Sequence, residues 1–162
     1  MNVVNLSDCP FVPWRNGGGR TRELLAWPTV SDWLVRVSVA EIEADGPFSP
    51  FTGIDRCFAV LEGAGVELAL PAGVVRLGPE SDALAFAGED APACHLLAGP
   101  TRDLNLMARR DAGRITMQRE PPTRTAALWR GLFANDTLWW TDDPSRPLPS
   151  RGSGWWLTLE NR

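Results

Sequence analysis

The sequence predicts an all-β protein, a sandwich or a barrel of short antiparallel strands. The 15 glycines and 14 prolines divide the 162 residues into short segments, few of which are long enough for an ordinary helix. Many of these segments alternate apolar and polar residues with the period of two that is typical of a strand. At this length we expect one compact domain, or two small barrels fused in one chain.

The clearest strand covers residues 33–42, where Trp33 and three valines at every second position form an apolar face. The opposite face carries Arg36 and Ser38. A second strand is expected over residues 56–62. The glycines at positions 63 and 65 that follow it fit a tight hairpin into residues 66–70.

Further short strands are expected between the next glycines and prolines, over residues 74–77, 83–87 and 93–98. Together with the two strands before them they would form a meander. Residues 33–100 are therefore predicted to form one antiparallel sheet that closes on itself.

The last third of the chain predicts a second, smaller layer. Residues 101–111 fit one face of a helix and one face of a strand equally well, so their pattern leaves both open. The expected strands of the smaller layer are 114–120, 125–133, 137–141 and 155–160, interrupted by a proline-rich stretch at 143–149.

Composition excludes several classes of function. All 16 basic residues are arginine and tyrosine is absent, which excludes Schiff-base, lysine-base and tyrosine-acid mechanisms. The net charge is −4 and the arginines are scattered, so we expect no nucleic-acid partner. No apolar run reaches the roughly 20 residues that span a bilayer, and the first residues do not resemble a signal peptide. We therefore expect a cytoplasmic protein without a membrane partner.

The cysteines and the single histidine argue against a metal centre or another cofactor. Cys9, Cys57 and Cys94 lie far apart, so we expect buried reduced thiols rather than disulfides or zinc ligands. First-row metals in β-barrel proteins favour several histidine ligands, whereas this chain has only His95. No motif around His95 indicates a catalytic triad, and we assign no catalytic residue.

A glycine-rich string covers residues 13–23 (PWRNGGGRTRE). Gly17, Gly18 and Gly19 free the backbone for positive φ and expose successive N–H groups, which can cradle a carboxylate or phosphate. The string lacks the lysine and the spacing of nucleotide-binding loops. A tight turn where two segments pass closely explains the glycines equally well.

This string resembles the opening signature of the HutD/Ves family, Pro-Trp-(Lys/Arg)-Asn-Gly-Gly-Gly followed by Thr-x-Glu. Arg15 stands where the family more commonly has lysine, which keeps the charge but changes its geometry. The resemblance continues in order along the chain and ends at Arg110. It runs through Trp33, residues 36–42 (RVSVAEI), 46–49 (GPFS), Phe51, 53–56 (GIDR), 61–63 (LEG), 86–88 (FAG), 99–100 (GP), 103–107 (DLNLM) and 109–110 (RR).

The resemblance implies a bicupin-like fold, with two small antiparallel β-barrels or sandwiches in one compact chain and little helix. Residues 1–110 would form the main barrel, and residues 111–162 would contribute to the second. The family is associated with bacterial histidine utilisation or stress response, and no enzymatic activity is securely attached to it. The resemblance thus favours a binding protein over an enzyme.

We expect the ligand site inside the main barrel. Paired arginines with amide or hydroxyl donors suit a carboxylate, so the predicted ligand is a small carboxylate metabolite such as urocanate or formyl- or formimino-glutamate. Each residue also has a plain structural alternative, in which the arginines face solvent and Asp103 caps a helix. The predicted ligand-binding residues are Asn16, Gly17, Gly18, Gly19, Arg36, Ser38, Arg56, His95, Asp103 and Asn105.

Two other functions stay open at this point. A metal-independent isomerase or hydrolase would use His95, Asp103 or Glu41 as acid or base in the same pocket. A protein-interaction module would present the paired tryptophans Trp139–Trp140 and Trp155–Trp156 on its surface. A homodimer is compatible with either of these functions and with a binding protein.

Overall fold

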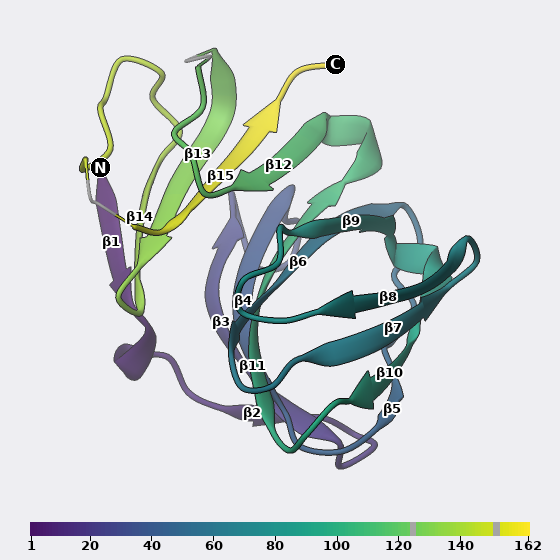
Figure 1. Ribbon diagram of the computed structural model, residues 1–162. Coiled ribbons are helices and arrows are strands. Elements are labelled where there is room, and N and C mark those ends of the chain that lie inside the picture. The colour runs from purple at the N-terminus through teal and green to yellow at the C-terminus, as the bar shows by residue number, and fades with distance from the viewer. Residues whose placement is uncertain (124–125, 151–152) are drawn as a thin grey trace.

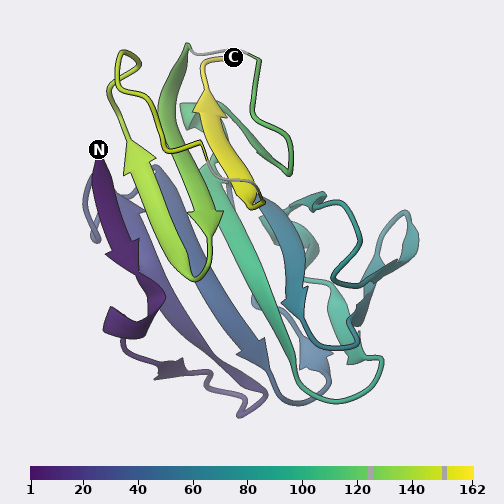
Figure 2. The same ribbon diagram turned by 60° about the vertical axis from the view of Figure 1, so that its left-hand side comes forward.

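A six-stranded antiparallel sheet lies at the centre of the protein, with a smaller sheet on each side (Figures 1 and 2). The computed structural model describes residues 1–123, 126–150 and 153–162. Within these ranges the only helical elements are three single 3-10 turns, η1 (Leu6–Asp8), η2 (Gly88–Asp90) and η3 (Arg110–Ala112). The predicted all-β class is therefore confirmed.

The order of strands in the central sheet is β2-β3-β4-β11-β6-β9. These strands are β2 (Val12–Pro13), β3 (Gly19–Trp27), β4 (Val35–Ile42), β11 (Thr101–Arg109), β6 (Ile54–Glu62) and β9 (Leu84–Ala87). The four-stranded sheet has the order β5-β10-β7-β8, with β5 (Gly46–Pro47), β10 (Ala93–Leu96), β7 (Val66–Leu70) and β8 (Gly73–Leu77). The five-stranded sheet has the order β1-β14-β13-β15-β12, with β1 (Asn2–Asn5), β14 (Thr137–Thr141), β13 (Ala127–Ala134), β15 (Trp155–Glu160) and β12 (Arg114–Gln118).

Alternation along the central strands gives this sheet two different faces. In β4, Val35 and Val37 are fully buried against the five-stranded sheet, whereas Arg36 and Ser38 point to the opposite side. Residues 101–109, whose pattern also fitted a helix, form a strand because β4 and β6 pair with them on both sides. The strand interpretation placed Asp103 and Asn105 on one face, and both line the same cavity as Arg36.

Two separate cores hold the three sheets together. The larger core fills the space between the central and five-stranded sheets, around the fully buried Trp129. The smaller one joins the central sheet to the four-stranded sheet, around Phe58 and Leu68. Because Phe58 lies on β6 between residues that face the larger core, this strand contributes to both cores.

The predicted hairpin at Gly63–Gly65 is wrong, because β6 pairs with β11 and β9 whereas β7 pairs with β8 and β10. The glycines instead carry the chain from the central sheet into the four-stranded sheet. Gly65 has a φ of +108°, and a Cβ atom there would lie 2.1 Å from the carbonyl oxygen of Leu77. The glycine at position 65 is therefore required by a close crossing of two backbones rather than by a hairpin.

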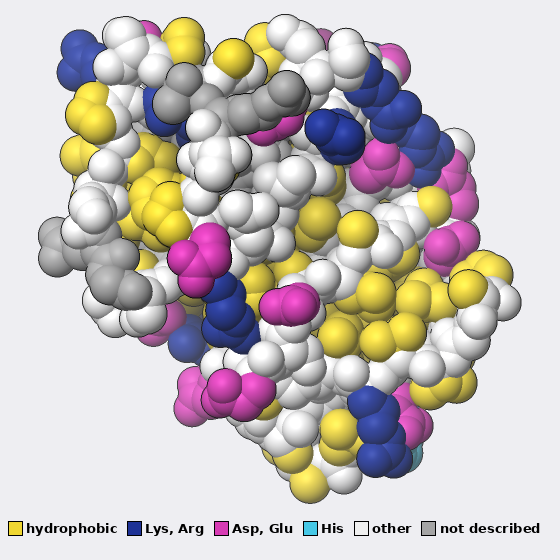
Figure 3. Space-filling view, turned by 45° about the horizontal axis from the view of Figure 1, so that its top comes forward, with side chains coloured by type: hydrophobic (Ala, Val, Ile, Leu, Met, Phe, Trp, Pro, Cys, Tyr) yellow, Lys and Arg dark blue, Asp and Glu magenta, His cyan; other side chains and the backbone are white. Residues whose placement is uncertain are grey.

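Residues 33–100 do not form one closed meander, since their strands belong to two sheets. One part of the expected meander is confirmed, since β7 and β8 pair with each other through the turn before Gly73. β8 and β9 are edge strands, and an apolar groove of about 460 Å³ lies between them, lined in part by Val75, Leu84 and Phe86. Figure 3 shows hydrophobic side chains gathered on this side of the molecule.

The second layer contains the four C-terminal strands that the sequence predicts, and Thr125, the first residue expected in one of them, lies outside the described residues. The layer also takes β1 from the N-terminus, which pairs with β14 from Asn2↔Trp140 to Asn5↔Thr137. Strands from both ends of the chain thus belong to one sheet (Figure 2). Within the described residues no helix has the length and apolarity needed to cross a membrane.

Candidate functional site

A cavity of about 890 Å³ opens on the polar face of the central sheet. Its floor is made by alternate residues of β3, β4, β6 and β11, and the segments before β3 and after β5 form its walls. This volume is in the range of pockets that hold small metabolites. The lining residues are Val12, Pro13, Trp14, Arg15, Asn16, Thr21, Glu23, Arg36, Ser38, Ala40, Pro47, Phe48, Ser49, Phe51, Arg56, Asp103, Asn105 and Met107.

Arg56 is the most deeply buried cation of the cavity, with 5% of its surface exposed. Its guanidinium carbon lies 5.1–5.6 Å from the ring centroids of Phe48, Phe51 and Phe86, so aromatic rings surround the charge. Burial lowers the pKa of Arg56 to about 10, although the charge of Asp103 acts in the opposite direction. The side chain is therefore still a cation at neutral pH.

Asn105 links Arg56 to Asp103. Nη2 of Arg56 donates to Oδ1 of Asn105 over 2.7 Å, and Nδ2 of Asn105 donates to Oδ1 of Asp103. Nε of Arg56 and Oδ2 of Asp103 have no hydrogen-bond partner among the described residues. Burial raises the pKa of Asp103 well above its usual range, and the charge of Arg56 offsets this only in part. The trio thus favours a neutral Asp103 beside a charged Arg56.

Arg36 differs from Arg56 because a carboxylate already pairs with it. Its Nε donates to Oε1 of Glu23 on the neighbouring strand over 2.8 Å. Both side chains are partly accessible, with 24% and 35% exposed. Ser38, which is 4% exposed, lies beyond them on the cavity floor. The floor of the cavity therefore has one arginine that is neutralised by Glu23 and one that is held by a neutral amide.

The three glycines of the string do not line the cavity. Other residues of the string do line it, namely Pro13, Trp14, Arg15, Asn16, Thr21 and Glu23. The N–H of Gly18 donates to Oδ1 of Asn16 over 2.8 Å, and the N–H of Gly17 donates to the carbonyl of Trp14 over 3.1 Å. A Cβ atom on Gly19 would lie 2.5 Å from the carbonyl oxygen of Glu41. These contacts favour the tight-turn explanation over an anion cradle, since two of the three N–H groups already have partners within the loop.

His95 does not join the residues of the cavity. It lies on β10 with 62% of its side chain exposed, and its Nδ1 is 2.7 Å from Oδ2 of Asp45. Glu41 is also outside, because it lies on the opposite face of β4 from Ser38. Of the predicted ligand-binding residues, the structure brings together Asn16, Arg36, Ser38, Arg56, Asp103 and Asn105.

Sequence reasoning missed the aromatic walls and the partner of Arg36. The family signature could have drawn attention to them, because Phe48, Phe51 and Glu23 all belong to its segments. Their position within the signature does not indicate which way they point. Among the described residues no group of three or more His, Cys, Asp or Glu side chains is placed to hold a metal ion.

The comparisons with known proteins agree on one family. The HutD family model matches residues 6–146. Protein Ves from Cronobacter sakazakii is 31% identical over 96% of this chain and 87% of its own. An uncharacterised 21.2 kDa protein in the hutC 3' region of Pseudomonas putida is 38% identical over 109 residues, and this match spans 57% of that protein.

Solved structures show the same relationship in three dimensions. HutD from Pseudomonas fluorescens SBW25 superposes with a TM-score of 0.85 at 26% identity, covering 99% of this chain and 98% of that one. The cupin domain of Cnp3 from Schizosaccharomyces pombe superposes with a TM-score of 0.51 at 14% identity, covering 64% of this chain and 71% of that one. The likeness to Cnp3 concerns the fold alone.

Proposed function

The chain belongs to the HutD family, and from that premise we propose that it binds a small carboxylate metabolite in the cavity of its cupin-like barrel. Arg56 would provide the main charge contact, and Arg36 would provide a second one nearer the opening. The histidine-utilisation association of the family directs the choice of ligands to urocanate and to formyl- or formimino-glutamate.

The environment of Arg56 carries this proposal. A buried guanidinium is costly unless its charge and its N–H groups are satisfied. Here Asn105 accepts one hydrogen bond, three aromatic rings lie close to the charge, and burial raises the pKa of the nearby Asp103 well above its usual range. A ligand carboxylate in the cavity would supply the missing negative charge, and its hydrogen bonds to arginine would be charge-assisted.

The walls favour a flat or slender acid. Phe48, Phe51 and Trp14 line the cavity together with Met107, so apolar contacts are available to an unsaturated chain or an imidazole ring. Ser38 and Asn105 supply hydrogen-bonding groups on the floor. Urocanate combines a carboxylate, a planar conjugated chain and a ring, which matches this set of contacts.

A metal-independent enzyme is the second candidate, and Asp103 is the observation that favours it. A carboxyl group with a strongly raised pKa inside a cavity is a candidate general acid. The other acid–base residues considered for this role, His95 and Glu41, lie outside the cavity. The other carboxylate of the cavity, Glu23, is paired with Arg36. Asp103 is therefore a weaker basis for catalysis than Arg56 is for binding, and we place binding first.

The interaction-module alternative has less support. Trp155 is 6% exposed, Trp140 stacks on the buried Trp129, and Trp139 and Trp156 are half-buried. The tryptophan pairs thus contribute mainly to the packing of the five-stranded sheet.

Thermal unfolding with a panel of acids tests the proposal. Urocanate, formylglutamate and formiminoglutamate would be compared with urocanamide, which keeps the ring and the conjugated chain without the negative charge. A ligand that binds only the folded state raises the melting temperature by mass action. We expect at least one of the acids to do so and the amide to have no effect, whereas equal behaviour of acid and amide would reject the carboxylate contact.

The same samples separate a binding protein from an enzyme. The concentration of the acid that binds is followed by chromatography for several hours at substoichiometric protein. A binding protein leaves it unchanged. An isomerase or hydrolase consumes it, and Asp103→Asn would then abolish the consumption while retaining the thermal shift.

A further inference from the structure

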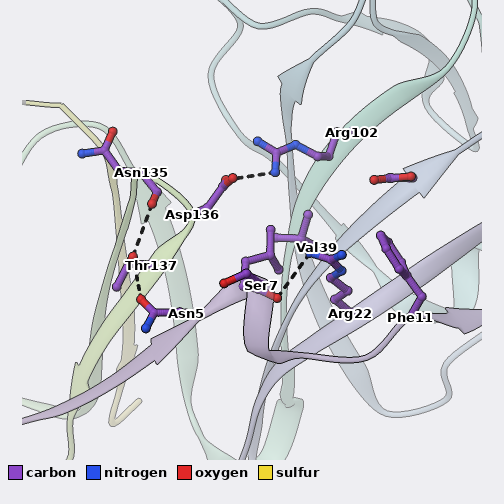
Figure 4. A pocket seen from close by; sticks show the side chains of 11 residues that line it. Asn5, Ser7, Phe11, Arg22, Val39, Arg102, Asn135, Asp136 and Thr137 are labelled. Atoms are coloured by element: carbon purple, nitrogen blue, oxygen red, sulfur yellow. Dashed lines mark hydrogen bonds and ion pairs between the residues drawn. The ribbon is translucent and has the colours of Figure 1, made fainter.

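A second hollow lies on the reverse side of the central sheet from the cavity, where strands β3, β4 and β11 meet the five-stranded sheet (Figure 4). Its volume is about 320 Å³. Arg22 and Arg102 approach it from the central sheet, and Asn135 to Thr137 approach it from the β13–β14 turn. Arg22 is next to Glu23 and Arg102 is next to Asp103 in the sequence, so the two sites lie back to back on the same strands.

Phe11 holds the side chain of Arg22 in place at one side of this hollow. The guanidinium carbons of Arg20 and Arg22 each lie 3.7 Å from the centroid of its ring. Two guanidinium groups cannot occupy the same side of one ring at that distance, so they take opposite sides. Stacking of this kind fixes the plane of the guanidinium and leaves its edge free for hydrogen bonds.

Arg22 has no counter-ion among the described residues, unlike the other charged groups of the hollow. Glu41 forms an ion pair with Arg20 at 2.8 Å, and Arg102 forms one with Asp136 at 2.9 Å. Arg22 donates one long hydrogen bond, 3.3 Å, to the carbonyl of Leu6, and its Nε has no acceptor. The hollow therefore contains one positive charge that nothing in it neutralises.

Neutral donors complete the lining. Ser7 belongs to η1, and Thr137 and Asn5 are joined by a hydrogen bond of 3.2 Å beside Asn135. Hydroxyl and amide groups beside a stacked arginine are the groups that recognise oxyanions. The β13–β14 turn is held in a defined shape, since Asn135 and Asp136 both adopt positive φ angles.

We propose that this hollow is a second anion site, which binds a small oxyanion, a carboxylate or a phosphate group, between Arg22 and Arg102. The anion neutralises Arg22 and shares Arg102 with Asp136. It also adds a contact between the segment around η1 and the β13–β14 turn, which the N–H of Leu6 already joins by a hydrogen bond of 2.8 Å to the carbonyl of Asp136. This site is independent of the cavity ligand, because its contacts lie on the opposite face of the sheet.

Amide NMR titrations test this site directly, with acetate and inorganic phosphate as probes at constant ionic strength. We expect the signals of Ser7, Asn135 and Asp136 to shift and saturate with a single Kd for at least one probe. The probe that saturates identifies the oxyanion as a carboxylate or a phosphate. Shifts that stay linear for both probes would overturn the proposal, because screening by salt has no saturation.

Variants show which arginine carries the effect. Arg22→Gln should raise the Kd about tenfold or more, since a charge-assisted contact is lost. Arg76→Gln is the matched control, because Arg76 is 74% exposed on β8 and should leave the Kd unchanged. Arg56→Gln removes the proposed contact in the cavity and should also leave the Kd of the second site unchanged. The two proposed sites can therefore fail independently of each other.

A second substitution covers the case in which Arg22→Gln does not fold. Arg22→Lys keeps the positive charge but loses the planar fork, so it should fold and bind more weakly than the natural protein. A Kd that neither substitution changes would show that Arg22 does not hold the anion.

Discussion

Arg56 on β6 and Asn105 on β11 are diagonal neighbours rather than direct partners in the sheet. The register pairs Arg56 with Met107 and Asn105 with Phe58, yet Nη2 of Arg56 reaches Oδ1 of Asn105 over 2.7 Å. A neutral amide thus holds the buried cation where a carboxylate would have cancelled its charge. The positive charge stays available to whatever enters the cavity.

Arg56→Met should remove carboxylate binding while the protein still folds. Methionine fills much of the volume among the aromatic rings without the charge. A ligand present at about 100 times its Kd stabilises the natural protein by about 2.7 kcal/mol, and the variant should lose this increment. Without ligand, we expect the free energy of unfolding to change by less than about 2 kcal/mol. Thermal unfolding with and without urocanate measures both quantities.

Arg76→Met is the control for that experiment, because it removes an arginine from an exposed ion pair with Glu67 on another sheet. It should keep the full effect of the ligand. If Arg56→Met also keeps it, Arg56 is a structural residue and the binding site lies elsewhere.

Glu23→Gln should strengthen binding of a carboxylate severalfold. Glu23 now occupies Nε of Arg36 at 2.8 Å and competes with the ligand for it. Glutamine keeps the shape but not the charge, so Arg36 becomes available. The ion pair is partly exposed, and its loss should cost less than about 1 kcal/mol of stability. Isothermal titration with the acid found in the thermal screen gives the Kd, and weaker binding by the variant would contradict a direct role of Arg36.

The sequence predicts the local parts of this fold better than their connections. The strand at residues 33–42 and the position of Arg36 and Ser38 on its polar face follow from alternation alone, because a strand places successive residues on opposite faces. The assignment of β9 and β10 to different sheets does not follow from the alternation of apolar and polar residues. Strand pairing depends on which strands are neighbours in the folded protein. The glycines at positions 63 and 65 are compatible with a close crossing of two backbones as well as with a hairpin, so they do not distinguish the two.

The site shows the same division. Asp103 and Asn105 could be predicted from their place in the family signature, because the pattern of residues 101–111 fits a helix as well as a strand. His95 has an equally suggestive chemistry, but β10 turns it outward, where Asp45 from the segment before β5 pairs with it. The contribution of β1 to the sheet of the C-terminal strands has no local signal at all, since its partner β14 lies more than a hundred residues further along the chain.

Cys57 and Cys94 should resist thiol reagents in the folded protein. Burial raises the pKa of each thiol to about 12, so almost no reactive thiolate exists at neutral pH. Cys9 is only half-buried, and we expect it to react first, although burial raises its pKa as well. Mass spectrometry after brief iodoacetamide treatment should show one modified cysteine before unfolding and three in urea. Early modification of Cys57 would indicate an opening of the larger core.

Gly19→Ala should destabilise the fold by about 2 kcal/mol or more, because overpacking against a backbone atom has no cheap relaxation. The new Cβ atom would lie 2.5 Å from the carbonyl oxygen of Glu41 and 3.0 Å from the ring of Trp14. Gly18→Ala is the neighbouring control, since its nearest contact is the flexible side chain of Asn16 at 3.2 Å. Urea unfolding compares the two, and equal stability would mean that the tight turn does not require glycine at position 19.

The stability of the Asp103→Asn variant should increase relative to that of the natural protein as the pH rises. Burial raises the folded-state pKa of Asp103 above the ordinary value of 3.8, so the folded protein holds a proton that the unfolded chain releases. Below pH 3.8 both states are protonated and this favourable contribution is fully present. It is lost as the pH rises from there through the folded-state pKa. Asparagine has no such proton, and the natural protein should lose stability relative to the variant over that interval.

The difference in the free energy of unfolding between the two proteins isolates this residue, because the other carboxylates are the same in both. Urea unfolding at several pH values from 4 to 8 provides it. A difference that is independent of pH would mean that the pKa of Asp103 is the same in both states. A difference with the opposite slope would mean that Arg56 holds Asp103 in its ionised form, and the cavity would then contain a matched ion pair and no free positive charge for a carboxylate ligand.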